Sequence, residues 1–177
     1  PFATGVMVVL VGKATRLAQF LDKDEKEYTA TVRFGFETDT GDVTGSRTTD
    51  CGLRNEDVAA MLDKVDWVSV LQKFQGEIQQ VPPMYSAKKV EGKRLYELAR
   101  KGIEIERNAV TVTIHKLEIA ASELHALHSE LRFRVTCSAG TYIRTLAEDI
   151  GRAVGLGAHL TELRRTRAGR FAIDDAV

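Results

Sequence analysis

Arg144 is the residue of this sequence whose surroundings most clearly indicate chemistry. An alternating apolar strand pattern at 131–137 leads into a turn at 138–140, and apolar residues then recur at helical spacing over 143–154. Thr141 is placed to cap the start of this helix. A guanidinium held rigidly in a first helical turn is permanently charged and costly to leave unpaired. The sequence therefore predicts an anionic partner for Arg144, best satisfied by a carboxylate in bidentate contact.

Two kinds of partner within the sequence fit this arginine. Glu148 lies four residues further along the same helix, where an ion pair on a solvated face is common. The polar turn at 38–45 instead offers Asp39 and Asp42 as carboxylates for an active cleft. Both aspartates are also suited to Asx turns that bond the nearby backbone. The residues alone leave these interpretations open.

Hydrophobic periodicity predicts the elements that must position this arginine. Pro82 and Pro83 fix an extended segment, and an irregular turn is expected at 118–129. A short apolar element around Leu160 and Leu163 precedes a basic stretch. Strands are expected at 5–12, buried on both faces, and at 27–36, 74–81, 110–114 and 131–137, the last two forming a hairpin. Helices are expected at 14–21, 54–65 and 93–101, and from Ile143 onward.

Composition excludes some classes of protein and leaves others open. The 177 residues carry 25 Lys and Arg against 25 Asp and Glu, so net charge does not indicate a nucleic-acid binder. Basic residues nevertheless concentrate at 88–107 and 144–170, which favours a basic face, although solvated mixed-charge helices are the alternative. Cys51, Cys137 and the four histidines lack ligand spacing, so no metal is expected. No membrane-spanning run or signal peptide is visible, which predicts a cytoplasmic protein.

Five stretches of the sequence form an ordered set. They read Pro-Phe-Ala-Thr-Gly at 1–5, Lys-Glu-Tyr at 26–28, Val-Pro-Pro-Met-Tyr-Ser-Ala-Lys-Lys at 81–89, Ser-Ala-Gly-Thr-Tyr-Ile-Arg-Thr-Leu-Ala-Glu-Asp-Ile-Gly at 138–151, and His-Leu-Thr-Glu-Leu-Arg-Arg-Thr-Arg-Ala-Gly at 159–169. Each stretch alone is a weak signal, but together they extend over nearly the whole chain. In this order they resemble the bacterial tRNA pseudouridine-55 synthases, the TruB family.

This resemblance implies an α+β fold, with a mixed, largely antiparallel sheet flanked by helices. It implies that residues 1–177 form one pseudouridine synthase catalytic domain that is incomplete at its N-terminus. The implied reaction isomerises uridine to pseudouridine at position 55 in the T-loop of tRNA, using a carboxylate and no cofactor. Only 171–177 remain after the last motif and Arg170, so we expect the family's small C-terminal RNA-binding domain to be absent.

The family's functional residues match positions in this sequence. By resemblance, Arg144 orients the catalytic aspartate, and Tyr28 stacks on the base and assists proton removal, although its strand phase alone fits a plain core residue. The implied partner is the tRNA T-arm stem-loop, bound by a monomer with no membrane association. Substrate contacts are implied for Tyr142, Leu163, Tyr85 and Asp42, and RNA contacts for Lys88, Lys89, Lys93, Arg94, Arg164, Arg165 and Arg167.

The sequence departs from the family at one place. The family's catalytic aspartate immediately precedes the motif that begins here at Pro1, and no other aspartate matches it. Either a preceding segment belongs to a longer enzyme, or this polypeptide is whole and has no turnover. We expect the first, because Arg144 would otherwise lack a carboxylate. The alternative function is a non-catalytic RNA-binding or tRNA-folding module with the same cleft.

Overall fold

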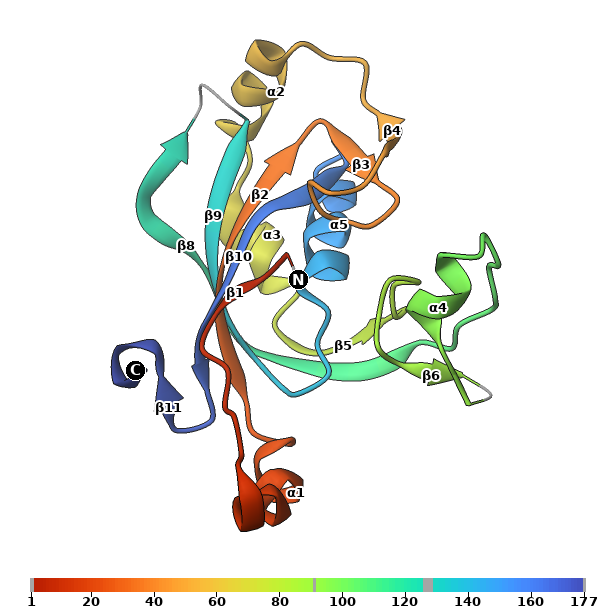
Figure 1. The fold of residues 1–177 in the computed structure, drawn as a ribbon. Helices are drawn as coiled ribbons and strands as arrows, with labels where there is room; N and C mark the ends of the chain where they lie inside the picture. Colours follow the sequence, from red (N-terminus) through yellow and green to blue (C-terminus); the bar gives the residue numbers. More distant parts are fainter. Residues whose placement is uncertain (1, 91, 126–128, 177) are drawn as a thin grey trace.

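One mixed sheet forms the centre of the molecule (Figure 1). The computed structural model describes residues 2–90, 92–125 and 129–176. Among these, β1 and β10 pair in parallel and the other pairings in the sheet are antiparallel, which confirms the predicted fold class. In spatial order the strands are β1 (Thr4–Gly5), β10 (Ala158–Ala168), β2 (Lys26–Phe34), β9 (Glu130–Cys137), β8 (Val110–His125) and β5 (Gly76–Gln80), and β11 (Phe171–Ala172) also pairs with β10.

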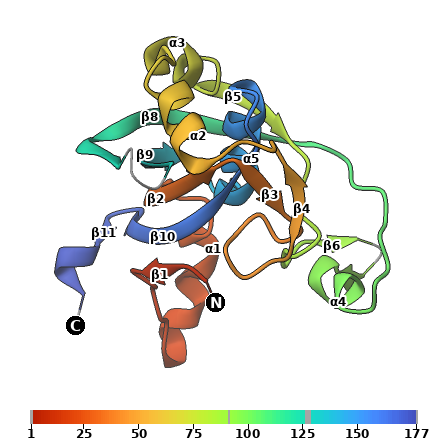
Figure 2. The same cartoon turned by 90° about the horizontal axis from the view of Figure 1, so that it is seen from above.

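Three helices cover one face of this sheet. They are α2 (Asn55–Leu62), α3 (Trp67–Gln72) and α5 (Ile143–Ala153), and they lie on the same side of β2 and β10 in Figure 2. Trp67 of α3 packs against Phe34 and Phe133, with ring centroids 5.6 and 6.0 Å apart. The predicted alternation of β9 is confirmed, because its apolar residues through Cys137 face this core.

The start of α5 differs from the predicted one. Tyr142, in an extended conformation, is the N-cap residue, and its side chain makes no capping hydrogen bond to the helix. The Thr141 hydroxyl instead donates to the Ser138 carbonyl at 2.9 Å, inside the preceding turn. The prediction that Thr141 caps the helix is therefore wrong, because its hydroxyl bonds backward along the chain.

The predicted strand at 5–12 is also wrong. Strand β1 ends at Gly5, and Met7, Val9 and Val11 are 72%, 70% and 78% exposed. The chain leaves β10 there and gains no second partner strand among the described residues. It continues as a projecting arm, residues 6–21, through the 3₁₀ helix η1 (Gly12–Leu17) and α1 (Ala18–Leu21). Periodicity identified the apolar run, but periodicity cannot reveal whether a neighbour exists to cover it.

Two further predictions underestimated strand length. Strand β8 continues to His125, where a turn was expected from 118, and residues 126–128 of that turn lie outside the described part. Strand β10 is 11 residues long, where only a short apolar element was expected around Leu160 and Leu163. β10 hydrogen-bonds to β2 on one side and to β1 on the other. These pairings explain why the strand continues through the arginine-rich residues of its second half.

Two small hairpins project from the sheet. The first consists of β3 (Phe36–Thr38) and β4 (Arg47–Asp50), which enclose the loop at 39–46. The second, between β5 and β8, consists of β6 (Lys89–Val90), β7 (Lys93–Arg94) and α4 (Leu95–Ala99), and it stands to one side in Figure 1. The described chain closes with the 3₁₀ turn η3 (Ile173–Asp175). None of the described helices is long and apolar enough to cross a membrane.

Candidate active site

Arg144, the second residue of α5, joins three segments that are distant in sequence. Its Nη1 donates to the Asp42 Oδ2 at 3.0 Å and to the Thr40 carbonyl at 3.1 Å. Its Nη2 donates to the Tyr85 carbonyl at 2.7 Å. The Arg144 side chain is 26% exposed, whereas that of Asp42 is 3% exposed. The guanidinium of Arg144 is therefore partly accessible to solvent, whereas the Asp42 carboxylate that neutralises it is buried.

Asp42 is held as a carboxylate by its own loop. Its Oδ1 accepts hydrogen bonds from the Thr40 hydroxyl, the Thr44 hydroxyl and the Thr44 N–H. Burial works to raise the pKa of Asp42, but the hydrogen bonds from Thr44 and Thr40 and the charge of Arg144 outweigh it. The pKa of Asp42 therefore lies below its usual range.

Backbone contacts place this loop on the sheet. The Leu160 N–H donates to the Gly41 carbonyl at 3.0 Å, and the Val43 N–H donates to the Leu160 carbonyl at 2.8 Å. Gly41 has a φ of +70°, and a Cβ at this position would lie 3.2 Å from the Arg144 Cβ and 2.6 Å from the Glu148 Oε1. Glycine is therefore required both by the turn and by the close approach of α5.

The structure resolves the alternatives for the partner of Arg144. The expectation that this chain leaves Arg144 without a carboxylate is wrong, because Asp42 supplies one. Asp42 also makes the Asx-type contact with the Thr44 N–H, so it bonds its own turn and pairs with Arg144 at the same time. Glu148 approaches Arg152 instead, at 3.9 Å.

Gln80 and Thr40 belong to this site and were missed in the sequence. Gln80, the last residue of β5, accepts from the Tyr142 N–H at 2.9 Å and donates to the Tyr142 carbonyl at 3.2 Å. Tyr85 lies five residues further along the same connection. The available signal was a glutamine on the same strand phase as Ile78, two residues before Pro82 and Pro83. Thr40 gave no comparable signal, because it contributes a carbonyl that any residue provides.

A second acidic group lies along α5, one turn beyond Arg144. Burial raises the pKa of Glu148 to about 7, and the carboxylate of Glu37 adds to this rise, against the attraction of Arg152. Arg152 binds Glu37 through two hydrogen bonds and lies 3.5 Å from Asp149. These side chains line a polar cavity of about 430 Å³.

Tyr28 and Leu163 lie on β2 and β10, packed against the same core as Ile143, which precedes Arg144. Tyr28 pairs across the strands with Arg165, and the Arg165 Nε donates to the Val6 carbonyl at 2.7 Å. Burial raises the pKa of Tyr28, despite a hydrogen bond and a charge from Arg165 that lower it. The phenol is therefore neutral near pH 7.

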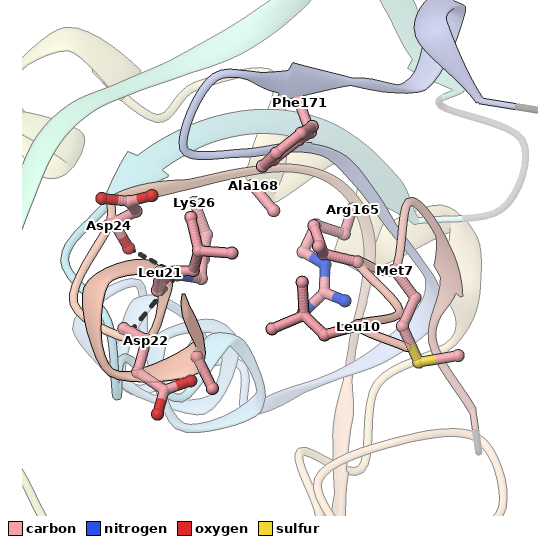
Figure 3. A pocket seen from close by; sticks show the side chains of 11 residues that line it. Met7, Leu10, Leu21, Asp22, Asp24, Lys26, Arg165, Ala168 and Phe171 are labelled. Carbon is pink, nitrogen blue, oxygen red and sulfur yellow. Dashed lines mark hydrogen bonds between the residues drawn. The ribbon is translucent and has the colours of Figure 1, made fainter. Parts of the chain in front are cut away.

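A cavity of about 310 Å³ opens beside this part of β10 (Figure 3). The arm contributes Met7 and Leu10 to its wall, and Arg165 extends its guanidinium toward them. Lys26 donates to the carbonyls of Leu21, Asp22 and Asp24 and so closes the opposite side. The cavity combines apolar walls with two cations and with the carboxylates of Asp22 and Asp24.

The basic residues predicted to bind RNA separate into two sets. Lys89, Lys93 and Arg94 are exposed on the β6–β7 hairpin, and Lys88, just before it, is half-buried. The arginines of β10 are divided between the faces of the sheet. Arg164 is exposed opposite Thr29, Arg165 faces Tyr28, and Arg167 pairs with Glu25 at 3.3 Å.

The predicted site residues therefore form two groups. Asp42 and the backbone carbonyl of Tyr85 bind Arg144, and Tyr142 is the N-cap residue two positions before it, while Leu163 and Arg165 accompany Tyr28 on the strands. Among the described residues, no group of three or more His, Cys, Asp or Glu side chains is arranged to hold a metal ion. The first group offers the Arg144–Asp42 charge pair, and the second offers the partly apolar surface of Tyr28 and Leu163.

Residues 1–143 match the TruB family pseudouridylate synthase N-terminal domain, and residues 144–177 match the tRNA pseudouridylate synthase B C-terminal domain. The division falls between the first two residues of α5, and strands from both ranges share one sheet.

Relatives with curated names cover the whole chain. It is 51% identical over 177 residues to tRNA pseudouridine synthase B of Aromatoleum aromaticum, and spans 54% of that protein. It is 49% identical over 178 residues to the enzyme of the same name from Chlamydia pneumoniae, and spans 71% of it.

Solved structures show the same fold. A chain in the crystal structure of a Cbf5–Nop10–Gar1 complex matches 96% of this chain and 38% of its own length, with 30% identity and a TM-score of 0.62. A chain in the archaeal box H/ACA Nop10–Cbf5 complex matches 96% of this chain and 36% of its own, with 27% identity and a TM-score of 0.55.

Proposed function

Because this chain belongs to the TruB family of pseudouridylate synthases, we propose that it carries the arginine-bearing part of an enzyme that converts uridine 55 of tRNA to pseudouridine. The observation that carries the proposal is the ion pair between Arg144, which lies in the motif at 138–151, and Asp42 of the 39–46 loop. The chain spans 54% of one relative and 71% of another, so the activity is proposed for the complete gene product.

In this proposal Arg144 binds a second carboxylate, which acts as the nucleophile. A guanidinium has five N–H donors, and three of them have acceptors among the described residues: Asp42, Thr40 and Tyr85. The remaining donors are available to a catalytic aspartate placed immediately before Pro1. A fixed positive charge there keeps that carboxylate ionised and oriented for attack.

Asp42 is poorly suited to be the nucleophile itself. One oxygen binds Arg144, the other accepts from Thr40 and Thr44, and the residue is 2% exposed. A carboxylate with both oxygens engaged and no access to solvent does not reach a sugar carbon. We assign Asp42 the role of anchoring Arg144, and we propose that this chain alone has no turnover.

Tyr28 and Leu163 form the proposed wall for the uracil ring. The target uridine must leave its base stack to reach a buried carboxylate, and aromatic stacking compensates for that loss. The raised pKa of Tyr28 favours a neutral ring that stacks and donates a hydrogen bond. Tyr142, at the start of α5, completes the wall on the Arg144 side.

The reaction balances without any cofactor. The N1–C1′ bond breaks as the carboxylate takes C1′, and the free uracil then rotates within the closed wall. A C5–C1′ bond forms as the carboxylate leaves. One proton departs from C5 and one is gained at N1, so substrate and product are isomers.

The exposed hairpin residues Lys89, Lys93 and Arg94 are proposed to hold the T-arm backbone.

The test compares two proteins on one substrate. This chain and the full product of its gene are each mixed with a T-arm stem-loop hairpin, and both binding and pseudouridine content are measured. We expect salt-dependent binding by both and conversion by the full product only. Binding without conversion by the full product would favour a non-catalytic RNA-binding or tRNA-folding module. Absence of binding by both proteins at low salt would reject both functions.

A further inference from the structure

Gln80 makes a two-point contact with the residue that starts α5. Its side-chain amide accepts from the Tyr142 N–H at 2.9 Å and donates to the Tyr142 carbonyl at 3.2 Å. Gln80 is 1% exposed, so its amide group is held away from bulk water and depends on Tyr142 for these bonds. The pair of bonds reproduces a strand-to-strand backbone contact and fixes both the position and the direction of this peptide segment.

The helix start has no local substitute for this contact. Tyr142 is the N-cap of α5, and no side chain caps the helix from that position. Thr141 directs its hydroxyl back to the Ser138 carbonyl. The Tyr142 carbonyl also begins the helical ladder, because it accepts from the Leu146 N–H at 3.0 Å. The place where α5 begins is thus set from β5, an element more than sixty residues earlier.

Arg144 lies two residues beyond this clamp, and its contacts depend on where the helix begins. They reach Asp42 from the 39–46 loop and the Tyr85 carbonyl from the segment that follows Gln80. Gln80 therefore holds the start of the helix that carries Arg144. It also begins the segment that leads to Tyr85, whose carbonyl accepts a hydrogen bond from Arg144. A shift of the helix start moves the guanidinium relative to both partners.

We propose that Gln80 is a positioning residue for Arg144, acting through the Tyr142 backbone. This rests on the proposed function, since it assigns Gln80 to the same site. Displacing a catalytic group by about 1 Å lowers turnover by about 100-fold without necessarily changing substrate binding. The proposal therefore concerns turnover, whereas a purely structural glutamine would affect only stability.

The test uses the full gene product and a T-arm hairpin as substrate. Gln80→Met keeps the size of the side chain and removes both bonds, and we expect kcat to fall about 10- to 100-fold. The KM should stay within about 2-fold. Gln80→Glu keeps the acceptor for the Tyr142 N–H and should fall between this variant and the wild type. The control is Gln79→Ala on the same strand, which loses an exposed bond to Thr111 and should match the wild type.

Three results would overturn the proposal: a folded Gln80→Met protein with wild-type kcat, a loss confined to KM, or unfolding of both Gln80 variants. If the wild-type protein makes no pseudouridine, the proposed function fails and nuclear magnetic resonance decides the positioning role separately. The Arg144 Nε–H signal should then move in Gln80→Met but not in Gln79→Ala, and Tyr142 amide exchange should quicken. An unmoved Arg144 signal would refute the positioning role.

Discussion

The two ends of β10 meet very different surroundings. Around Leu160, the 39–46 loop bonds the strand backbone and carries the buried Asp42 to Arg144. Around Arg165, the strand borders the open cavity formed with the arm, whose Met7 is 72% exposed. The charge pair is thus assembled from this chain alone, whereas the Tyr28 side remains open to further contacts.

This difference separates two tasks of the proposed enzyme. A charged pair must be held rigidly before substrate arrives, because reorganising it during the reaction would cost rate. A surface that receives an extruded base must instead stay accessible. The chain places its satisfied polar contacts at the first end and its exposed apolar residues at the second. Variants at each end should therefore fail in different ways.

The largest effect on stability is expected for Asp42→Asn. It removes the counter-charge of Arg144 and should lower the free energy of unfolding by about 3 kcal/mol, since breaking a buried pair leaves an uncompensated charge. The matched control is Asp39→Asn, because Asp39 is exposed and accepts a single bond from the Ser46 N–H. That variant should cost less than about 1 kcal/mol. Equal losses in urea unfolding would contradict the account.

An effect no larger than this is expected from the ionisation of Glu148. Its pKa in the folded protein is raised to about 7 from a usual value of 4.5, so the folded state binds the proton more tightly than the unfolded state. Stability should therefore fall as pH rises from about 4.5 to 7, by at most about 3 kcal/mol. Glu148→Gln should flatten this slope, and Glu77→Gln, at an exposed position of β5, should leave it unchanged. An unaltered slope in Glu148→Gln would show that another group is responsible.

At the open end, Gly5→Ala should release the arm with little effect on the rest of the fold. A Cβ there would lie 2.1 Å from the Arg165 carbonyl oxygen, which the β1–β10 pairing cannot accommodate. Gly12→Ala is the control, because Gly12 also has a positive φ but faces open space. Hydrogen exchange should show lost protection at 6–21 in Gly5→Ala only. Global unfolding of Gly5→Ala would mean that the arm is integral to the core.

The smallest effects concern RNA affinity. Arg167 is already engaged by Glu25 and the Gly169 carbonyl, so Arg167→Ala should change T-arm affinity little. Lys93 is exposed on the β6–β7 hairpin, and Lys93→Ala should weaken binding about 2- to 3-fold and reduce the salt slope by about one. Binding measured at several salt concentrations checks both. The reverse ranking would place the RNA on β10 rather than on the hairpin.

Local patterns in the sequence predicted the strands and helices whose apolar residues recur at the spacing of a strand or a helix. The alternation ending at Cys137 gave β9, and the apolar repeat from Ile143 gave α5, because each pattern reflects a face that must be buried. The arm and β10 were mispredicted for one shared reason. Whether an apolar or arginine-rich stretch becomes a long strand depends on partners that are far away in the chain.

The candidate site was predicted to a similar extent. Arg144 stood out because a charge in a core-facing helix demands a partner, and Asp42 was already among the candidate carboxylates. Their pairing spans 102 residues and could not be read locally. Gln80 was missed because it bonds to the backbone of Tyr142. Every residue type except proline has the same backbone groups, so the type of residue at 142 gives no sign of this contact.

The most direct test of the central claim is single-turnover pseudouridine formation by Arg144→Lys in the full gene product. Lysine keeps the charge but loses the planar fork that serves Asp42 and a second carboxylate together. The account predicts that conversion of a T-arm hairpin falls at least about 100-fold while the Kd for the hairpin stays within about 3-fold. Wild-type conversion, or a loss explained entirely by weaker binding, would contradict it.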